Sequence, residues 1–364
     1  MCETLYKSFC SIQCTWLNPL YESKLVSVIV PTYQRAWLIC KTLDSVLGQT
    51  YRPIELIVVD DGSTDNTKQT IKEWQENAVT DSDFRFKYIR QVHIGTCAAR
   101  NRGAVKSRGE YLQFLDSDDL LGPQKISAQV ECLSRQNYMH AVFGDFRRFA
   151  HTTWGILVYP AAKLPRYESA LRDWLGGRFS ASHSILWRRK DLAKIGSWNE
   201  TLTANQDGDL ATRFLLNNGR LTYCWGGWSY YRCYFGRHTR ITKRVDRDSM
   251  KSKQMVLKQI EHILEDRGGL ESYREVLANA YFELAEDSSL NNREIMEACL
   301  KKYYELKPNR DLPGSITQRT LRRVLGIRTK KWVTTALLNR LKVPPFMPIT
   351  FVSDISDLYA YDSA

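Results

Sequence analysis

Short apolar runs alternate with stretches of helical periodicity in the first third of the chain. LVSVIVP at 25–31 and ELIVVDD at 55–61 are continuous apolar runs, which predict strands buried on both faces. AWLICKTLDSVLGQ at 36–49 spaces its apolar residues by three and four, as one face of an amphipathic helix does. The strand and helix pattern recurs at 86–107, and EYLQFLDSDD at 110–119 adds another strand. The pattern predicts an α/β fold with a mostly parallel sheet covered by helices.

Changes in composition divide the remainder of the chain. After residue 150 the periodicity weakens, and the Trp- and Gly-rich segment WGGWSYYR predicts no defined order of elements. Helical periodicity returns from about 252 to 306 and predicts antiparallel helices. We therefore expect four parts: an N-terminal extension at 1–24, an α/β domain at 25–245, a helical region at 246–310 and a basic C-terminal tail at 311–364.

Composition narrows the class of protein. The 364 residues are 43% hydrophobic and 12% aromatic, which supplies more than one core and excludes a disordered or fibrous chain. Nine scattered cysteines without a C-x-x-C spacing indicate a reducing compartment and no structural zinc. The first residues lack the pattern of a signal peptide, and no run of about 18 apolar residues occurs, so we expect a cytoplasmic protein without a spanning helix.

Polar residues gather where the predicted strands end. The first strand is followed by Pro-Thr-Tyr at 31–33, the second ends in Asp-Asp at 60–61, and the last is followed by Asp-Ser-Asp-Asp at 116–119. The carboxyl ends of parallel strands meet at one edge, where open α/β sheets bind ligands, so these acids should converge. Asp116 and Asp118 can share Mg²⁺ or Mn²⁺, completed by a diphosphate. The alternative, a simple cap for the next helix, is less favoured because a second acidic strand end shares the edge.

Asp61 and Tyr33 indicate how a nucleotide base is held. A carboxylate accepts hydrogen bonds from a base edge, and a tyrosine ring stacks on a base. The alternative is a turn followed by a helix N-cap, a role that suits Ser63, Thr64 and Asp65. Neither G-x-G-x-x-G nor G-x-x-x-x-G-K-[ST] occurs, so we expect neither a dinucleotide fingerprint nor a P-loop.

These motifs carry a family resemblance. VSVIVPTYQRAWLICKTLDSVLGQTYRPIELIVVDDGSTDNT and GTCAARNRGAVKSRGEYLQFLDSDD resemble the nucleotide-sugar-binding half of family 2 glycosyltransferases, which are inverting enzymes of the GT-A fold. The resemblance extends from about residue 25 to 240 and is most specific before residue 120. It implies two groups of site residues. The nucleotide base is expected to contact Pro31, Tyr33 and Asp61. The metal and the ribose are expected to contact Asp118, with Asp116 or Asp119. Arg100 and Asn101 resemble positions near the nucleotide.

A later motif resembles the one that supplies the catalytic base. SASHSILWRRKDLAKIGSWNE resembles the acceptor-side segment, and NQDGDLATRFLLNNGR places Asp207 at the base, which would take the proton of the acceptor hydroxyl. The family usually has Glu before the base and an aromatic residue after it, but Gln206 and Gly208 stand here. A neutral Gln206 removes a charge that would favour protonated Asp207. The alternative takes Asp207 and Asp209 as solvated acids at a helix start.

The segment YRCYFGRHTR at 231–240 resembles a lid over the diphosphate. Tyr234 stands where the family usually has histidine, and Arg232 or His238 could substitute for that histidine. His93 and His183 are interpreted as packed or surface residues and not as ligands.

Basic residues are concentrated in two segments of a chain with a net charge of +12. The first, at 237–258, is interpreted as part of a mobile lid that meets phosphate charge. The second, at 311–345, mixes cations with Leu, Val and Trp, as an interfacial helix on anionic lipid does. An equally favoured alternative is a solvated helix packed on the catalytic domain. A nucleic-acid partner is not expected, because charge alone points to one.

Together, the residues and the resemblance predict an inverting glycosyltransferase that depends on Mn²⁺ or Mg²⁺. The donor would be a nucleotide-diphosphate sugar, with UDP favoured, and the acceptor a hydroxyl of a saccharide or of a lipid-linked molecule. The alternative is a catalytically silent nucleotide-sugar-binding or scaffold protein that uses its helical tail for partners. Gln206, Gly208 and Tyr234 are the departures that keep this alternative open.

Overall fold

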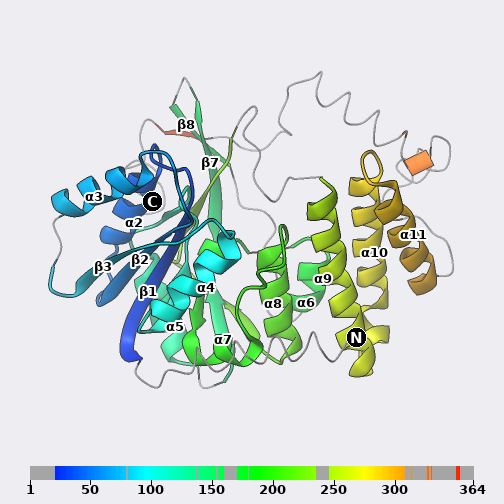
Figure 1. The fold of residues 1–364 in the computed structure, drawn as a ribbon. Helices are drawn as coiled ribbons and strands as arrows, with labels where there is room; N and C mark the ends of the chain where they lie inside the picture. Colours follow the sequence, from blue (N-terminus) through cyan, green and yellow to red (C-terminus); the bar gives the residue numbers. More distant parts are fainter. Residues whose placement is uncertain are drawn as a thin grey trace.

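The computed structural model describes most of the chain between residues 21 and 307. The described residues are 21–78, 81–136, 138–152, 155–159, 170–178, 180–234 and 246–307, with positions 313, 326, 327, 329 and 350–352. His238, most of the expected lid and nearly all of the basic tail lie outside them. An α/β unit and a helical region stand side by side (Figure 1).

A seven-stranded sheet forms the centre of the α/β unit. Its order is β10-β6-β9-β4-β1-β2-β3. The strands are β1 (Glu22–Thr32), β2 (Ile54–Asp60), β3 (Phe84–Arg90), β4 (Gly109–Phe114), β6 (His140–Phe143), β9 (Ile185–Arg188) and β10 (Arg220–Tyr223). All neighbours pair in parallel except β9, which is antiparallel to β4 and β6. The prediction of a mostly parallel sheet is confirmed.

Helices cover both faces of this sheet. They are α2 (Ile39–Leu47), α3 (Thr67–Asn77), α4 (Thr96–Lys106), α5 (Lys125–Ser134), α6 (Ala170–Leu175), α7 (Arg189–Ile195) and α8 (Gln206–Leu216). Successive side chains of a strand point to opposite faces. Val28 and Val30 therefore pack in one core with Leu43 of α2, while Ile29 packs in another with Ala104 of α4. The continuous apolar run of β1 is needed because both of its faces are buried.

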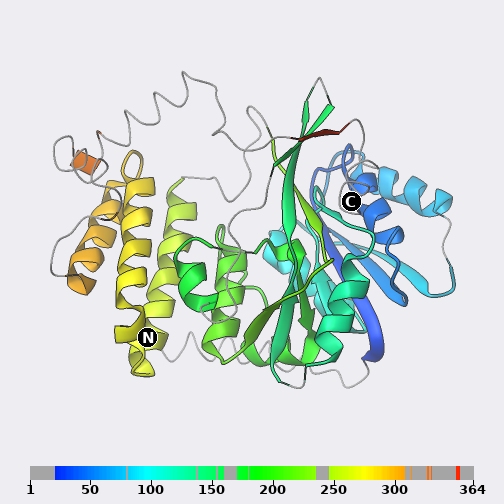
Figure 2. The ribbon, with the colours of Figure 1, turned by 180° about the vertical axis from the view of Figure 1, so that it is seen from behind.

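A second sheet is built from the region whose order the sequence did not predict. Its order is β12-β8-β7-β11-β5, and it contains β5 (Leu120–Leu121), β7 (Phe146–Thr152), β8 (Gly155–Tyr159), β11 (Ser229–Arg232) and β12 (Thr350–Val352). β7 and β8 project beyond the large sheet, as Figure 2 shows from behind. β5 directly follows the acidic segment at 116–119, and its pairing with β11 joins that segment to the second sheet.

The described residues 246–307 form three helices. They are α9 (Arg247–Asp266), α10 (Leu270–Ser288) and α11 (Arg293–Leu306). This confirms the helices expected there. Asp246 caps α9 by accepting a hydrogen bond from the Ser249 N–H at 2.9 Å. Glu261 of α9 joins all three helices, because it accepts from the Tyr281 hydroxyl at 2.7 Å and from Lys302 Nζ at 2.9 Å.

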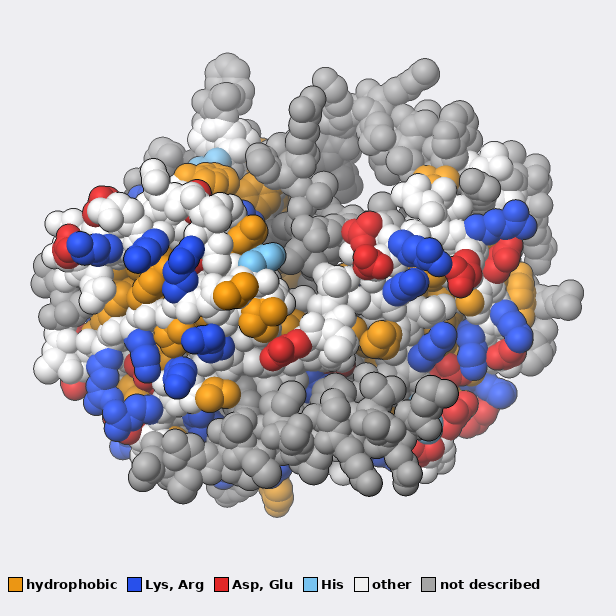
Figure 3. All heavy atoms as spheres, viewed as in Figure 1, with side chains coloured by type: hydrophobic (Ala, Val, Ile, Leu, Met, Phe, Trp, Pro, Cys, Tyr) orange, Lys and Arg blue, Asp and Glu red, His pale blue; other side chains and the backbone are white. Residues whose placement is uncertain are grey.

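The helical region shares a hydrophobic core with the α/β unit. Leu171, Leu175, Leu202 and Leu216 of the α/β unit belong to the same buried cluster as Leu277 and other residues of α9 to α11. On the face seen in Figure 3, Lys and Arg outnumber Asp and Glu over the α/β unit, while the two charge signs are more evenly mixed over the helices. In the part of the chain that the structure describes, no helix combines the length and the apolar character needed to cross a bilayer.

Candidate active site

The candidate site lies at the edge of the large sheet where β1, β2 and β4 end. Asp61 follows β2, and the acidic segment at 116–119 follows β4. Because β9 runs antiparallel to β4, the turn before it, η2 (Ser182–Ser184), reaches the same edge. The topology thus brings together the predicted acids and one segment that the sequence had placed on the acceptor side.

An aromatic pair stands at the end of β1. Tyr33 is 40% exposed, and its ring stacks on the ring of His93 with 4.1 Å between centroids and 23° between planes. Pro31 is buried in β1 opposite Val59, which fixes the strand end from which Tyr33 projects. In the sequence, His93 is a lone histidine and carries no ligand signal. Only the fold places it against Tyr33.

Asp61 is buried and holds the loop after β3. Its Oδ1 accepts from Gln91 Nε2 at 2.7 Å and from the Ile94 N–H at 3.0 Å, and its Oδ2 accepts from the Gly95 N–H at 2.9 Å. The Nδ1 of His93 lies 2.8 Å from the same Oδ2. The carboxylate of Asp61 therefore positions the backbone of residues 91–95 and, through it, the aromatic pair.

The three aspartates of the acidic segment have different surroundings. Asp116 is 31% exposed, and its Oδ1 accepts from Arg100 Nη2 at 2.6 Å. The Oδ2 of Asp118 accepts from the Tyr234 hydroxyl at 2.7 Å. Asp119 is fully buried, and its Oδ1 accepts from the Arg232 N–H at 2.8 Å while its Oδ2 lies 2.9 Å from His183 Nδ1.

The arrangement suits a divalent cation that needs few protein ligands. Among the described residues, no group of three or more His, Cys, Asp and Glu side chains could hold a metal. Mg²⁺ needs fewer, because one or two carboxylates and substrate phosphates complete its octahedron. Asp118 and the part-exposed Asp116 fit that requirement. Both oxygens of Asp119, by contrast, make contacts inside the fold, with the Arg232 N–H and with His183 Nδ1.

Arg100 connects the acidic segment to helix α8. Its guanidinium is buried, lies over the ring of Trp198 at 4.2 Å, and donates from Nη1 to Gln206 Oε1 at 3.1 Å. The same Nη1 lies 4.0 Å from Asp207 Oδ1. Burial alone would lower the pKa of Arg100, but the carboxylates of Asp116 and Asp207 raise it above its ordinary value. Arg100 therefore remains charged between two acids that it holds near each other.

Asp207 lies in the first turn of α8 and differs from Asp209. Burial raises the pKa of Asp207 to about 6, an effect that Arg100 opposes and Asp116 increases. Its side chain is nevertheless 36% exposed, so it can meet a substrate. Asp209 is 1% exposed and is paired with Arg213 at 2.6 Å. The alternative in which both are solvated helix-start acids is wrong for Asp209.

Gly208 lies directly against the side chain of Asn205. A Cβ at this position would lie 2.1 Å from the Oδ1 of Asn205, whose backbone is left-handed with φ of 56°. A side chain at position 208 would therefore require the Asn205 amide to move. Gln206 is also engaged, since it accepts from Arg100 and donates to the Leu202 carbonyl at 2.9 Å.

Two predicted site residues make contacts inside the protein. The Asn101 amide donates to the Trp198 carbonyl at 2.9 Å and to Glu200 at 2.7 Å, and it accepts from the Ser197 hydroxyl and the Trp198 N–H. Arg232 is 2% exposed and donates from Nε to the Asp118 carbonyl at 2.8 Å. Both residues hold loops of the site, and a direct contact with nucleotide or diphosphate stays a prediction.

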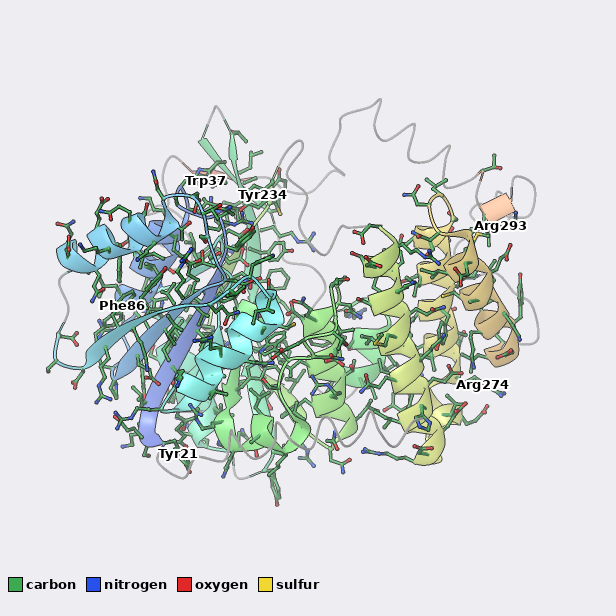
Figure 4. All side chains as sticks on the ribbon, viewed as in Figure 1. Tyr21, Trp37, Phe86, Tyr234, Arg274 and Arg293 are labelled. Atoms are coloured by element: carbon green, nitrogen blue, oxygen red, sulfur yellow. The ribbon has the colours of Figure 1, made fainter. Side chains whose placement is uncertain are left out.

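Tyr234 and Trp37 close one side of the acidic segment. Their rings meet edge to face with 6.4 Å between centroids, and Trp37 is 65% exposed. Figure 4 shows the pair at the edge of the large sheet, at the opposite end from Tyr21. In the sequence, Tyr234 stands out only as a departure at a position where the family usually has histidine. The structure gives it a definite role, because its hydroxyl orients the Asp118 carboxylate.

Comparisons with known proteins agree with the fold and the motifs. Residues 27–196 match the family described as glycosyl transferase family 2. An uncharacterized glycosyltransferase of Rickettsia conorii is 33% identical over 152 residues, which are 42% of this chain and 23% of that protein. The Escherichia coli UDP-Glc:alpha-D-GlcNAc-diphosphoundecaprenol beta-1,3-glucosyltransferase WfgD is 36% identical over 126 residues, which are 34% of this chain and 47% of that protein.

A solved structure extends the agreement to most of the chain. Staphylococcus aureus TarS 1-349 in complex with UDP-GlcNAc is 19% identical, with a TM-score of 0.58 over 90% of this chain and 97% of that one. The architecture is therefore that of a GT-A glycosyltransferase, followed by helices. The match to glycosyl transferase family 2 is confined to residues 27–196, a little under half of the chain. It spans less than half the length of the two curated relatives named above.

Proposed function

We propose that the protein is an inverting glycosyltransferase that uses a UDP-sugar. The observation that carries the proposal is the chain of contacts Asp116–Arg100–Asp207, with 2.6 Å and 4.0 Å between the charged atoms. It joins the acidic strand end expected to face the donor to a part-exposed carboxylate whose pKa of about 6 suits a general base. These contacts hold the residues expected to bind the donor close to the residue expected to act on the acceptor, as a transfer reaction requires.

The donor would lie along the edge from Tyr33 to Asp116. The part-exposed ring of Tyr33, supported by His93, offers a face on which a base stacks. Pro31 and Asp61 would hold this platform in place. Two relatives support uracil as the base, because WfgD is named for UDP-Glc and the TarS structure contains UDP-GlcNAc.

Asp118, with Asp116, would hold Mn²⁺ or Mg²⁺. When bound, the cation supplies positive charge that stabilises the leaving diphosphate. Tyr234 keeps one oxygen of Asp118 oriented by its hydroxyl hydrogen bond. The buried Asp119 and Arg232 would fix the backbone of the acidic segment and not contact the metal.

Asp207 would act on the acceptor. Its carboxylate takes the proton from the acceptor hydroxyl as that oxygen bonds to the anomeric carbon, and the bond from this carbon to the diphosphate oxygen breaks. Attack from the side opposite the diphosphate inverts the anomeric centre. Arg100 keeps Asp207 from becoming too weak an acid, because its charge lowers the pKa that burial raises.

The acceptor is proposed as a hydroxyl of a saccharide or of a lipid-linked saccharide. WfgD, by its name, acts on a diphosphoundecaprenol-linked sugar, which supports the lipid-linked class. We propose 25–245 as the catalytic domain and 246–310 as a helical region. The interfacial role of the tail at 311–364 rests on its sequence alone, since nearly all of it lies outside the described residues.

A turnover assay tests the proposal. We expect the full chain to hydrolyse or transfer from UDP-glucose or UDP-N-acetylglucosamine only when Mn²⁺ or Mg²⁺ is added, and Asp118→Ala to abolish this activity. UDP binding without turnover of either donor, with any acceptor supplied, would favour the silent binding protein. Turnover that is unchanged in Asp118→Ala would contradict the metal assignment.

A further inference from the structure

Unpartnered polar atoms concentrate on the segment that leads into β9. The side chains of Ser180, Ser182 and His183 are 0%, 5% and 1% exposed. Their hydroxyl oxygens and the His183 Nε2 have no hydrogen-bond partner among the described residues. A buried polar group without a partner costs free energy, and native proteins leave few of them unexplained. Three within four residues call for a ligand that supplies the partners.

The ring of His183 is held in one orientation. Its Nδ1 lies 2.9 Å from Asp119 Oδ2. One face stacks on Tyr231 with 5.8 Å between centroids, and Phe146 meets it edge to face at 6.0 Å. The carboxylate of Asp119 accepts, so Nδ1 carries a proton, and Nε2 points away from Asp119. Nε2 is thus a fixed polar group that a hydroxyl can pair with, since a hydroxyl both donates and accepts.

The position of His183 identifies the part of the substrate concerned. Through Asp119 it is joined to the acidic segment expected to face the diphosphate. It is also linked toward the proposed base, because the Asp119 N–H donates to the Asp116 carbonyl at 3.0 Å and Arg100 joins Asp116 to Asp207. In a single displacement, the transferred sugar lies between the diphosphate and the base. A group between the acidic segment and Asp207 therefore faces that sugar.

We propose that His183 and Ser182 bind hydroxyl groups of the sugar that is transferred, with His183 held for this purpose by Asp119. The inference rests on the proposed use of a UDP-sugar and goes further by assigning the contacts that recognise the sugar and not the nucleotide. Asp119 then has a positioning role in sugar recognition in place of the metal ligation expected from the motif.

Calorimetry tests the inference. It measures the affinity of the full chain, with Mn²⁺ present, for UDP, UDP-glucose and UDP-N-acetylglucosamine. His183→Asn keeps an N–H where Nδ1 stands, and so keeps the bond to Asp119, but it removes Nε2. We expect this variant to bind UDP as the wild type does and to lose about 10-fold in affinity for the UDP-sugar that the wild type prefers. Ser182→Ala should lose affinity for the same ligand only.

The control is His262→Asn on α9. The His262 side chain is 55% exposed and far from the acidic segment in sequence, so this variant should leave all three affinities unchanged. Equal losses for UDP and UDP-sugar in His183→Asn would indicate a purely structural role and overturn the inference. So would unchanged affinities, or a change confined to the KM of the acceptor. If the wild type binds none of the three nucleotides, the proposed function itself has failed, which is a different result from normal sugar-nucleotide binding by His183→Asn.

Discussion

Arg100 lies between two carboxylates and offsets part of the repulsion between them. It donates to Asp116 at 2.6 Å and lies 4.0 Å from Asp207, and its own burial is offset by these two charges. The pKa of Asp207 therefore stays at about 6, above that of an ordinary aspartate but low enough to be deprotonated near neutral pH. At the scale of single residues, this balance is what makes Asp207 suitable as a base.

Replacing the carboxylate of Asp207 tests this role. We expect Asp207→Asn to lower kcat by about 10²–10⁴-fold, the usual contribution of a general base, while UDP affinity is unchanged. Turnover with a UDP-sugar and calorimetry with UDP measure the two quantities. Asp209→Asn is the comparison, because it breaks the buried pair with Arg213 and should act mainly on stability. Normal turnover in Asp207→Asn would place the base elsewhere.

The same pKa predicts a pH profile. Below its pKa Asp207 is protonated and cannot accept a proton, so kcat/KM should fall as the pH drops below about 6 and reach a plateau above it. A second carboxylate beside Asp207 disfavours its charged form, so Gln206→Glu should move this acidic limb to higher pH. Gln206→Met removes the hydrogen bond to Arg100 without adding charge and should move it less. A limb that moves to lower pH in Gln206→Glu contradicts the electrostatic argument.

The sequence predicted several of the residues that meet at the edge, but not the internal contacts that each one makes there. The strand ends in the sequence placed Tyr33, Asp61 and Asp116 at one edge of the sheet, whereas Asp207 was assigned by the family resemblance of its motif. The internal bonds of Asp61 and Asp119 could not be predicted, because their partners come from segments 30 or more residues away. The stacking of His93 and the unpartnered Nε2 of His183 are likewise products of the fold.

At the scale of elements, helix α4 carries Arg100 and must lie close against the sheet. Gly103 allows this approach, since a Cβ there would lie 2.5 Å from Ile29 of β1 and 3.1 Å from Val59 of β2. The periodicity of the sequence predicted this helix but not its distance from the sheet. The order of the second sheet was also beyond prediction, because its strands come from distant segments and pair without a readable repeat.

Gly103→Ala tests this close packing. The added methyl group should force α4 away from the sheet and lower the free energy of unfolding by about 1–3 kcal/mol, as overpacking of a core does. Val105→Ala lies on the exposed side of the same helix and should change stability by less. Urea unfolding of the two variants and the wild type provides the measurement. A Gly103→Ala variant as stable as the wild type would mean that the interface can relax.

At the scale of the whole molecule, the helical region and the α/β unit are not independent. Leu171, Leu175, Leu202 and Leu216 of the α/β unit are buried in the same cluster as α9, α10 and α11. One side of α6 and one side of α8 thus pack against the helical region, and α8 also carries Asp207. The sequence divided the chain at residue 245 by its change of period, which gives no information on whether the two parts share a core.

A cavity in this shared core should destabilise both parts together. Leu277 of α10 is fully buried, so Leu277→Ala should cost about 2–5 kcal/mol. Residues 246–310 contain no tryptophan, so tryptophan fluorescence follows mainly the α/β unit, while far-UV circular dichroism follows all the helices. If the shared cluster couples the two parts, both signals shift to the same lower melting temperature in Leu277→Ala. The fluorescence transition could instead stay at the wild-type temperature while the dichroism transition moves. The α/β unit would then unfold independently, because its stability would not depend on the helices that cover α6 and α8.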